Sequence, residues 1–151
     1  MAVVLGAAFL DEHLRQVLAN FVIDDKKATA ELLENNGPLS TFSARTRAAY
    51  SLGLINKEER DDLNLIRKIR NRFAHDLHDL TFEDQNIVSW CYSLQLPKRL
   101  LSEMITEPGD LFIVAVAIHA QRIALLAIEI KMERRAKHRP TTIVNKIMED
   151  S

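Results

Sequence analysis

Hydrophobic residues recur along the chain at helical spacing, and no alternation of the kind found in strands is sustained beyond a few residues. The first helix that this spacing predicts covers about residues 3–22. Its apolar face holds Leu10, Leu14, Val17, Leu18 and Phe21. A second, shorter helix is expected over residues 27–33, because Asn-Asn-Gly-Pro at 35–38 is a strong helix breaker.

Capping residues mark two helices in the middle of the chain. Thr41 or Ser43 can cap a helix that continues until Gly53 ends it. Asn56, with Glu59 three residues later, predicts a capping-box start for the next and central helix. The apolar positions of this central helix are Leu63, Leu65, Ile66, Ile69 and Phe73.

Two short helices are predicted after the central one. Thr81 with Asp84 opens a helix that runs to Tyr92. Pro97 begins another, which stops near Pro108 and the glycine that follows it.

The longest predicted helix begins at its cap, Asp110, runs to about residue 137 and is apolar nearly all round until Glu129. Such a helix is expected at the centre of a core or in a dimer interface, so we predict a homodimer. The whole pattern predicts an all-α fold, an antiparallel helical bundle of six to seven helices. We expect one domain over residues 1–137 and a tail over 138–151 with a basic start and room for a short helix.

Composition and charge restrict the class of protein. The 151 residues are 47% hydrophobic, which is enough for one core without disulfides or metal. The 20 Lys and Arg against 21 Asp and Glu give a net charge of −1, so any site for nucleic acid must be a local patch. The single Cys91 cannot form an internal disulfide, which fits a reducing cytoplasm, and a packing role is expected for it.

No membrane or export segment is expected. The apolar N-terminus lacks a basic region before it and is too short for a membrane span. The long C-terminal helix is interrupted by His119, Gln121, Arg122 and Glu129. We therefore predict a cytoplasmic protein.

Basic residues gather at the end of the central helix, in Arg70-Asn71-Arg72-Phe73-Ala74-His75 and the preceding Arg67 and Lys68. An Arg guanidinium grips a phosphate with paired hydrogen bonds, and a His can take or give a proton near neutral pH. This set suits metal-independent cleavage of RNA by its own 2′-OH. The catalytic candidates are Arg70, His75 and Asn71, and the RNA-binding candidates are Arg67, Lys68 and Arg72.

Geometry limits this prediction. Arg70 and His75 are five residues apart and diverge by about 140° on an ideal helix. They converge on one substrate only if the helix ends near Ala74, or if two copies of the motif meet across a dimer. The structural alternative is a solvated basic face, whose cations complement the C-terminal end of the helix dipole.

The segment from Arg70 to His75 resembles the Arg-(four residues)-His motif of the HEPN superfamily. These are all-helical domains, many of them metal-independent endoribonucleases of toxin–antitoxin and antiphage systems. The resemblance implies a HEPN-like bundle, an active site composed across a homodimer, and an antitoxin as a protein partner.

A second resemblance covers about residues 7–84. Residues 37–45 and 49–55, the Arg-Asn-x-Phe-Ala-His segment and Phe82-Glu83-Asp84 are similar to the mannitol-repressor (MltR-like) family. This resemblance implies transcriptional regulation. No helix-turn-helix is expected at Ala49 and Gly53, because Glu59 stands where the second helix of that motif needs an apolar anchor.

Two functions stay open, and whether the chain is an enzyme is left uncertain. The first is a HEPN-type endoribonuclease, toxin-like or defence-like. The alternative is an MltR-like transcriptional regulator without its own helix-turn-helix, acting through RNA or a protein partner. No metal or other cofactor is predicted, because His13, His78, His119 and His138 show no ligand spacing, and His119 is expected in the core.

Overall fold

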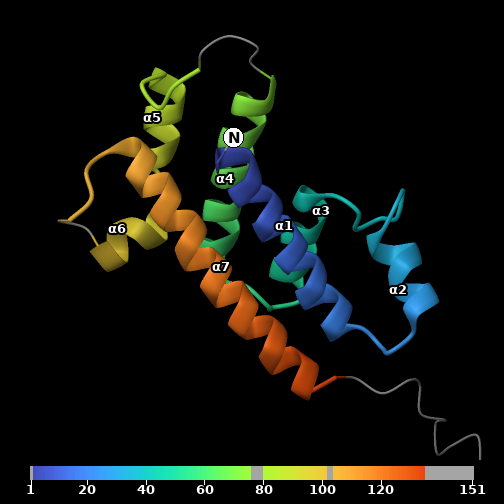
Figure 1. Ribbon diagram of the computed structural model, residues 1–151. Helices are drawn as coiled ribbons and strands as arrows, with labels where there is room; N and C mark the ends of the chain where they lie inside the picture. The colour runs from blue at the N-terminus through green and yellow to red at the C-terminus, as the bar shows by residue number, and fades with distance from the viewer. Residues whose placement is uncertain (1, 76–79, 102–103, 135–151) are drawn as a thin grey trace, which may run out of the picture.

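The computed structural model describes residues 2–75, 80–101 and 104–134, and this part of the chain contains seven α-helices and no strand (Figure 1). The helices are α1 (Ala2–Phe21), α2 (Lys26–Leu33), α3 (Phe42–Ser51), α4 (Lys57–His75), α5 (Gln85–Tyr92), α6 (Gln95–Leu101) and α7 (Pro108–Met132). The all-α prediction is confirmed. The predicted tail, and the predicted end of the long helix at residue 137, lie outside the described residues.

The two longest helices, α1 and α7, lie side by side and run in the same direction (Figure 1). Gly6 permits their close approach, since a Cβ atom there would lie 3.1 Å from Cγ1 of Val116. Further along, the Asn20 side chain donates to the carbonyl of Ala127 at 2.9 Å. Helix α4 completes the centre of the bundle by packing against both.

Helix starts follow the predicted caps at three places. Thr41 accepts a hydrogen bond from the amide of Ala44, and Asp84 caps α5. Asn56 and Glu59 form a reciprocal capping box. The Glu59 carboxylate accepts from the backbone amide of Asn56 at 2.8 Å, and the Asn56 side-chain oxygen accepts from the backbone amide of Glu59 at 3.0 Å. Gly53, at φ 72°, follows α3 in the left-handed conformation expected at its end.

Two predicted helix starts are corrected by the structure. Helix α6 begins at Gln95 and not at Pro97, because the distant carboxylate of Asp62 accepts the amides of Gln95 (2.7 Å) and Leu96 (3.0 Å). Helix α7 begins at Pro108 and not after Asp110. Proline is well suited to a first helical position, because its missing N–H would have no partner there.

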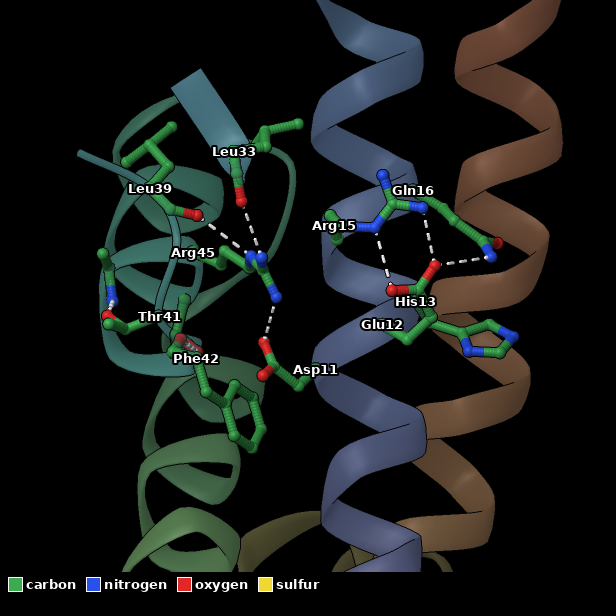
Figure 2. Close-up of polar contacts among 12 residues, drawn as sticks. Asp11, Glu12, His13, Arg15, Gln16, Leu33, Leu39, Thr41, Phe42 and Arg45 are labelled. Carbon is green, nitrogen blue, oxygen red and sulfur yellow. Dashed lines mark hydrogen bonds and ion pairs between the residues drawn. The ribbon is translucent and has the colours of Figure 1, made fainter. Parts of the chain in front are cut away.

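A buried arginine joins the segments before α3 to α1 (Figure 2). The guanidinium of Arg45 donates to the carbonyls of Leu39 (3.0 Å) and Leu33 (2.9 Å) and to the carboxylate of Asp11 (2.8 Å). The turn between Leu33 and Leu39 needs glycine at position 37, since a Cβ atom there would lie 2.5 Å from the backbone oxygen of Glu31. These contacts fix α2 and its loop against the bundle.

Candidate functional site

The candidate site is the C-terminal half of α4, whose position is set by the opposite side of the same helix. Leu63, Ile66 and Ile69 are fully buried and hold α4 in the core. Leucine and isoleucine at this spacing form one apolar face, so the basic residues between them project towards the surface.

Two of the predicted RNA-binding residues contact α5. The ammonium of Lys68 lies 4.2 Å from the centre of the Trp90 ring, a cation–π arrangement. Arg72 lies 3.8 Å from the carboxylate of Asp84, the residue that caps α5. These two side chains therefore help to hold α5 against α4, a role that the sequence did not reveal.

Arg67 and Arg70 are different, because part of each guanidinium is buried without a partner. Both residues are half-buried, and the Nε atom of each has no hydrogen-bond partner and almost no exposed surface. No carboxylate in the described ranges forms an ion pair with either of them. A buried donor without an acceptor is uncommon and costs free energy, which distinguishes these two arginines from Lys68 and Arg72.

The three predicted catalytic residues do not share one environment. Arg70 and Asn71 are half-buried, whereas His75 is exposed. Helix α4 remains helical through His75, so Arg70 and His75 project about 140° apart on it. The helix ends one residue after Ala74 and still includes His75.

The first half of α4 carries a buried polar cluster that sequence reasoning missed. Asp62 is fully buried and, besides capping α6, lies 3.1 Å from Nε2 of the equally buried His119 on α7. Since a carboxylate can only accept, Nε2 carries the hydrogen of this bond. Glu59 also reaches α7, accepting from Nε of Arg122 at 2.6 Å. The core location predicted for His119 is confirmed.

The contacts of Glu59 also concern a helix-turn-helix, which the sequence does not predict. Glu59, at the position of the missing apolar anchor, is buried in the capping box and the Arg122 pair. One side of the start of α4 is thus packed against α7, while Lys57 stays exposed. Within the described ranges, no three His, Cys, Asp or Glu side chains lie close enough to hold a metal ion.

The comparisons with known proteins decide between the two resemblances. A family model described as mannitol repressor matches residues 3–135. The chain belongs to the mannitol repressor family. The mannitol operon repressors of Escherichia coli strains K12 and O6:H1 (CFT073) are each 32% identical to it over 112 residues, which are 72% of this chain. The chain spans 57% of the length of these curated relatives.

A solved structure supports the fold. The chain is similar to one in the X-ray structure of the MtlR–HPr complex from Escherichia coli, with a TM-score of 0.57 and 23% identity. The match covers 85% of this chain and 87% of that one. The match shows that the two chains are similar in fold.

The prediction of a HEPN-type endoribonuclease, toxin-like or defence-like, is wrong. The family model covers most of the chain and both curated relatives are repressors, whereas the HEPN resemblance rested on six residues. The structure gives the physical reason why the motif misled. Lys68 and Arg72 contact α5, and Arg70 and His75 diverge on a continuous helix.

Proposed function

We propose that this chain is a regulatory protein of the mannitol-repressor type that acts by binding a protein partner and does not itself bind DNA. Three facts support the proposal: its family, the names of its curated relatives as mannitol operon repressors, and the contact between Glu59 at the start of α4 and Arg122 of α7. The structural neighbour was solved as a complex with HPr, so an HPr-type protein is the first partner to test.

The observation that supports a specific docking site is the pair of unsatisfied arginines, Arg67 and Arg70. A partner carboxylate that contacts the accessible part of their guanidinium groups would gain charge-assisted hydrogen bonds. We infer that the basic half of α4 receives an acidic part of the partner. RNA binding by Arg67, Lys68 and Arg72 stays a prediction. RNA phosphates would contact the same basic half of α4 as an acidic partner.

The test is calorimetric titration of HPr into the chain, for the wild type and for Arg70→Ala and Arg67→Ala. Each substitution is expected to weaken binding by roughly tenfold or more, the effect of losing one charge-assisted hydrogen bond. The matched control is Arg47→Ala, an exposed arginine on α3, which should bind as the wild type does.

The outcomes separate the partner from the site. No binding by the wild type would remove HPr as the partner. Equal binding by the wild type and both α4 variants would remove the basic half of α4 as the docking site. A mannitol-operon reporter, with and without the chain, tests the regulatory role directly, and specific binding of operon DNA by the purified chain would overturn action through a partner.

A further inference from the structure

Helix α7 leaves a large apolar surface uncovered. Ile113 is 60% exposed and Ile128 is 61% exposed, although both are large aliphatic residues within a 25-residue helix. The most apolar 18-residue window of α7 has a mean hydropathy of 2.1, yet only 33% of it is buried. Contiguous exposed apolar surface of this kind marks an interaction site.

The residues of this surface are ordered symmetrically about the point between Ala120, which is partly buried against the core of its own chain, and the exposed Gln121. We define the α7 face as the following eight residues: Asp110, Ile113, Ala117, Ala120, Gln121, Ala124, Ile128 and Lys131. Outward from the central pair, Ala120 and Gln121, come an alanine on each side, then an isoleucine on each side, then opposite charges. At 100° per residue all eight fall within an arc of about 100°, so they share one side of the helix.

This order is what a two-fold interface requires. When two identical helices pack in opposite directions about a two-fold axis, residues equidistant from the axis meet each other. With the axis between residues 120 and 121, Ile113 meets Ile128 of the second copy and Ala117 meets Ala124. Asp110 then lies opposite Lys131, so the charges at the ends attract. The alanines near the axis allow the two helices to approach closely.

We propose that two copies of this chain associate through the α7 face, with α7 packed against α7 in opposite directions. Leu5 (64%) and Phe9 (52%) are further exposed apolar residues on α1, the helix that packs against α7. A lipid surface fits less well, because Gln121 and Arg122 are exposed at the middle of the helix, where a bilayer centre disfavours polar groups. The proposal does not depend on Arg67 and Arg70 or on the identity of the regulatory partner.

The mass of the full chain in solution, measured by light scattering after gel filtration, tests association. We expect twice the 17.2 kDa chain mass for the wild type. Ile113→Lys should weaken the dimer by roughly tenfold or more, because it places charge in the interface of both copies. Since Ile113 is largely exposed in the single chain, the variant should keep its circular dichroism spectrum. Leu100→Lys, at a residue 56% exposed on α6, is the matched control and should stay dimeric.

Cysteine cross-linking tests the direction of packing. Ala117→Cys and Ala124→Cys should form a disulfide when the two variants are mixed and should form little when each is alone. The natural Cys91 will not interfere, because it is fully buried and burial raises the pKa of its thiol to about 12. Equal cross-linking of each variant with itself would overturn the antiparallel arrangement.

Three outcomes would overturn the proposal as a whole. They are a monomeric wild type at high micromolar concentration, a dimer that Ile113→Lys leaves intact, and partition of the chain into phosphatidylcholine vesicles in place of dimer formation. A dimer lost in Ile113→Lys, retained in Leu100→Lys and cross-linked only in the mixture would establish it.

Discussion

The two halves of α4 use their charged side chains in opposite ways. In the first half, Glu59, Asp61 and Asp62 all have partners, and two of these three are buried. In the second half, Arg67 and Arg70 keep buried Nε atoms that bond to nothing. The first half holds two basic and four acidic residues, whereas the charges of the second half are all basic. The buried acidic residues of the first half stabilise the fold, and Arg67 and Arg70 of the second half are those for which we propose a role in recognition.

Removal of Asp62, the most deeply buried charged residue in the first half of α4, should lower the free energy of unfolding more than any other change considered below. Asp62→Ala would leave the amides of Gln95 and Leu96 and the ring of His119 without their acceptor. We expect the free energy of unfolding to fall by about 3–5 kcal/mol, the cost of breaking a buried polar network. Urea denaturation followed by circular dichroism measures it.

The neighbouring Asp61→Ala is the matched control for Asp62→Ala. Asp61 pairs with Lys57 and Arg60 at the surface, and its loss should cost about 0–1 kcal/mol. Equal losses for the two variants would contradict the claim that burial, and not charge, distinguishes the residues of this half.

A smaller loss is expected from Glu59→Ala. This change removes one side of the capping box with Asn56 and the 2.6 Å bond from Arg122 of α7. We expect a loss of about 1–2 kcal/mol, the usual cost of a helix cap with one further hydrogen bond. Thermal unfolding compares it with Glu58→Ala, whose partner Arg99 is a more exposed surface residue. A loss from Glu59→Ala no larger than that of the control would show that the capping box contributes little.

How much of the fold can be predicted from the sequence depends on how far apart in the sequence the two partners of each interaction lie. The caps at Thr41, Asn56 and Asp84 were predicted because each one bonds within three residues of itself. The role of Asp62 was not, since its partners lie 33 to 57 residues away on α6 and α7. Arg45 was missed for the same reason, because its acceptors come from three separate segments.

The candidate site shows a second limit of sequence reasoning. The cluster of basic residues on α4 was found, but a cluster does not reveal which charges the fold itself uses. Lys68 and Arg72 are tied to α5, and only Arg67 and Arg70 carry the buried unpaired atoms. The position of Asp62 four residues before Ile66, on the apolar face, is the signal that could have indicated its burial.

In the second half of α4, substitution should change stability little or even raise it. Arg70→Met keeps the aliphatic volume and removes a buried Nε donor that has no acceptor. We expect a change in the free energy of unfolding between zero and a gain of about 1 kcal/mol, since replacing an unsatisfied polar group by an apolar one removes its desolvation cost. Urea denaturation beside the wild type is the measurement. A loss above about 2 kcal/mol would place Arg70 with the structural charges of the first half.

The smallest expected change in stability concerns the charged residues at the surface of the first half of α4. Lys57 and Arg60 hold the pKa of Asp61 below its ordinary value of 3.8, mainly through hydrogen bonding from Lys57. Because the folded-state pKa is the lower one, these pairs stabilise the chain above about pH 4 and stop doing so as the pH falls through the lowered pKa. Asp61→Asn should therefore be slightly less stable than the wild type at pH 7, and the difference should shrink as the pH falls through the lowered pKa. Melting temperatures of both proteins across this range measure it. A difference that persists unchanged at pH 2 would mean that Asp61 acts through packing and not through its charge.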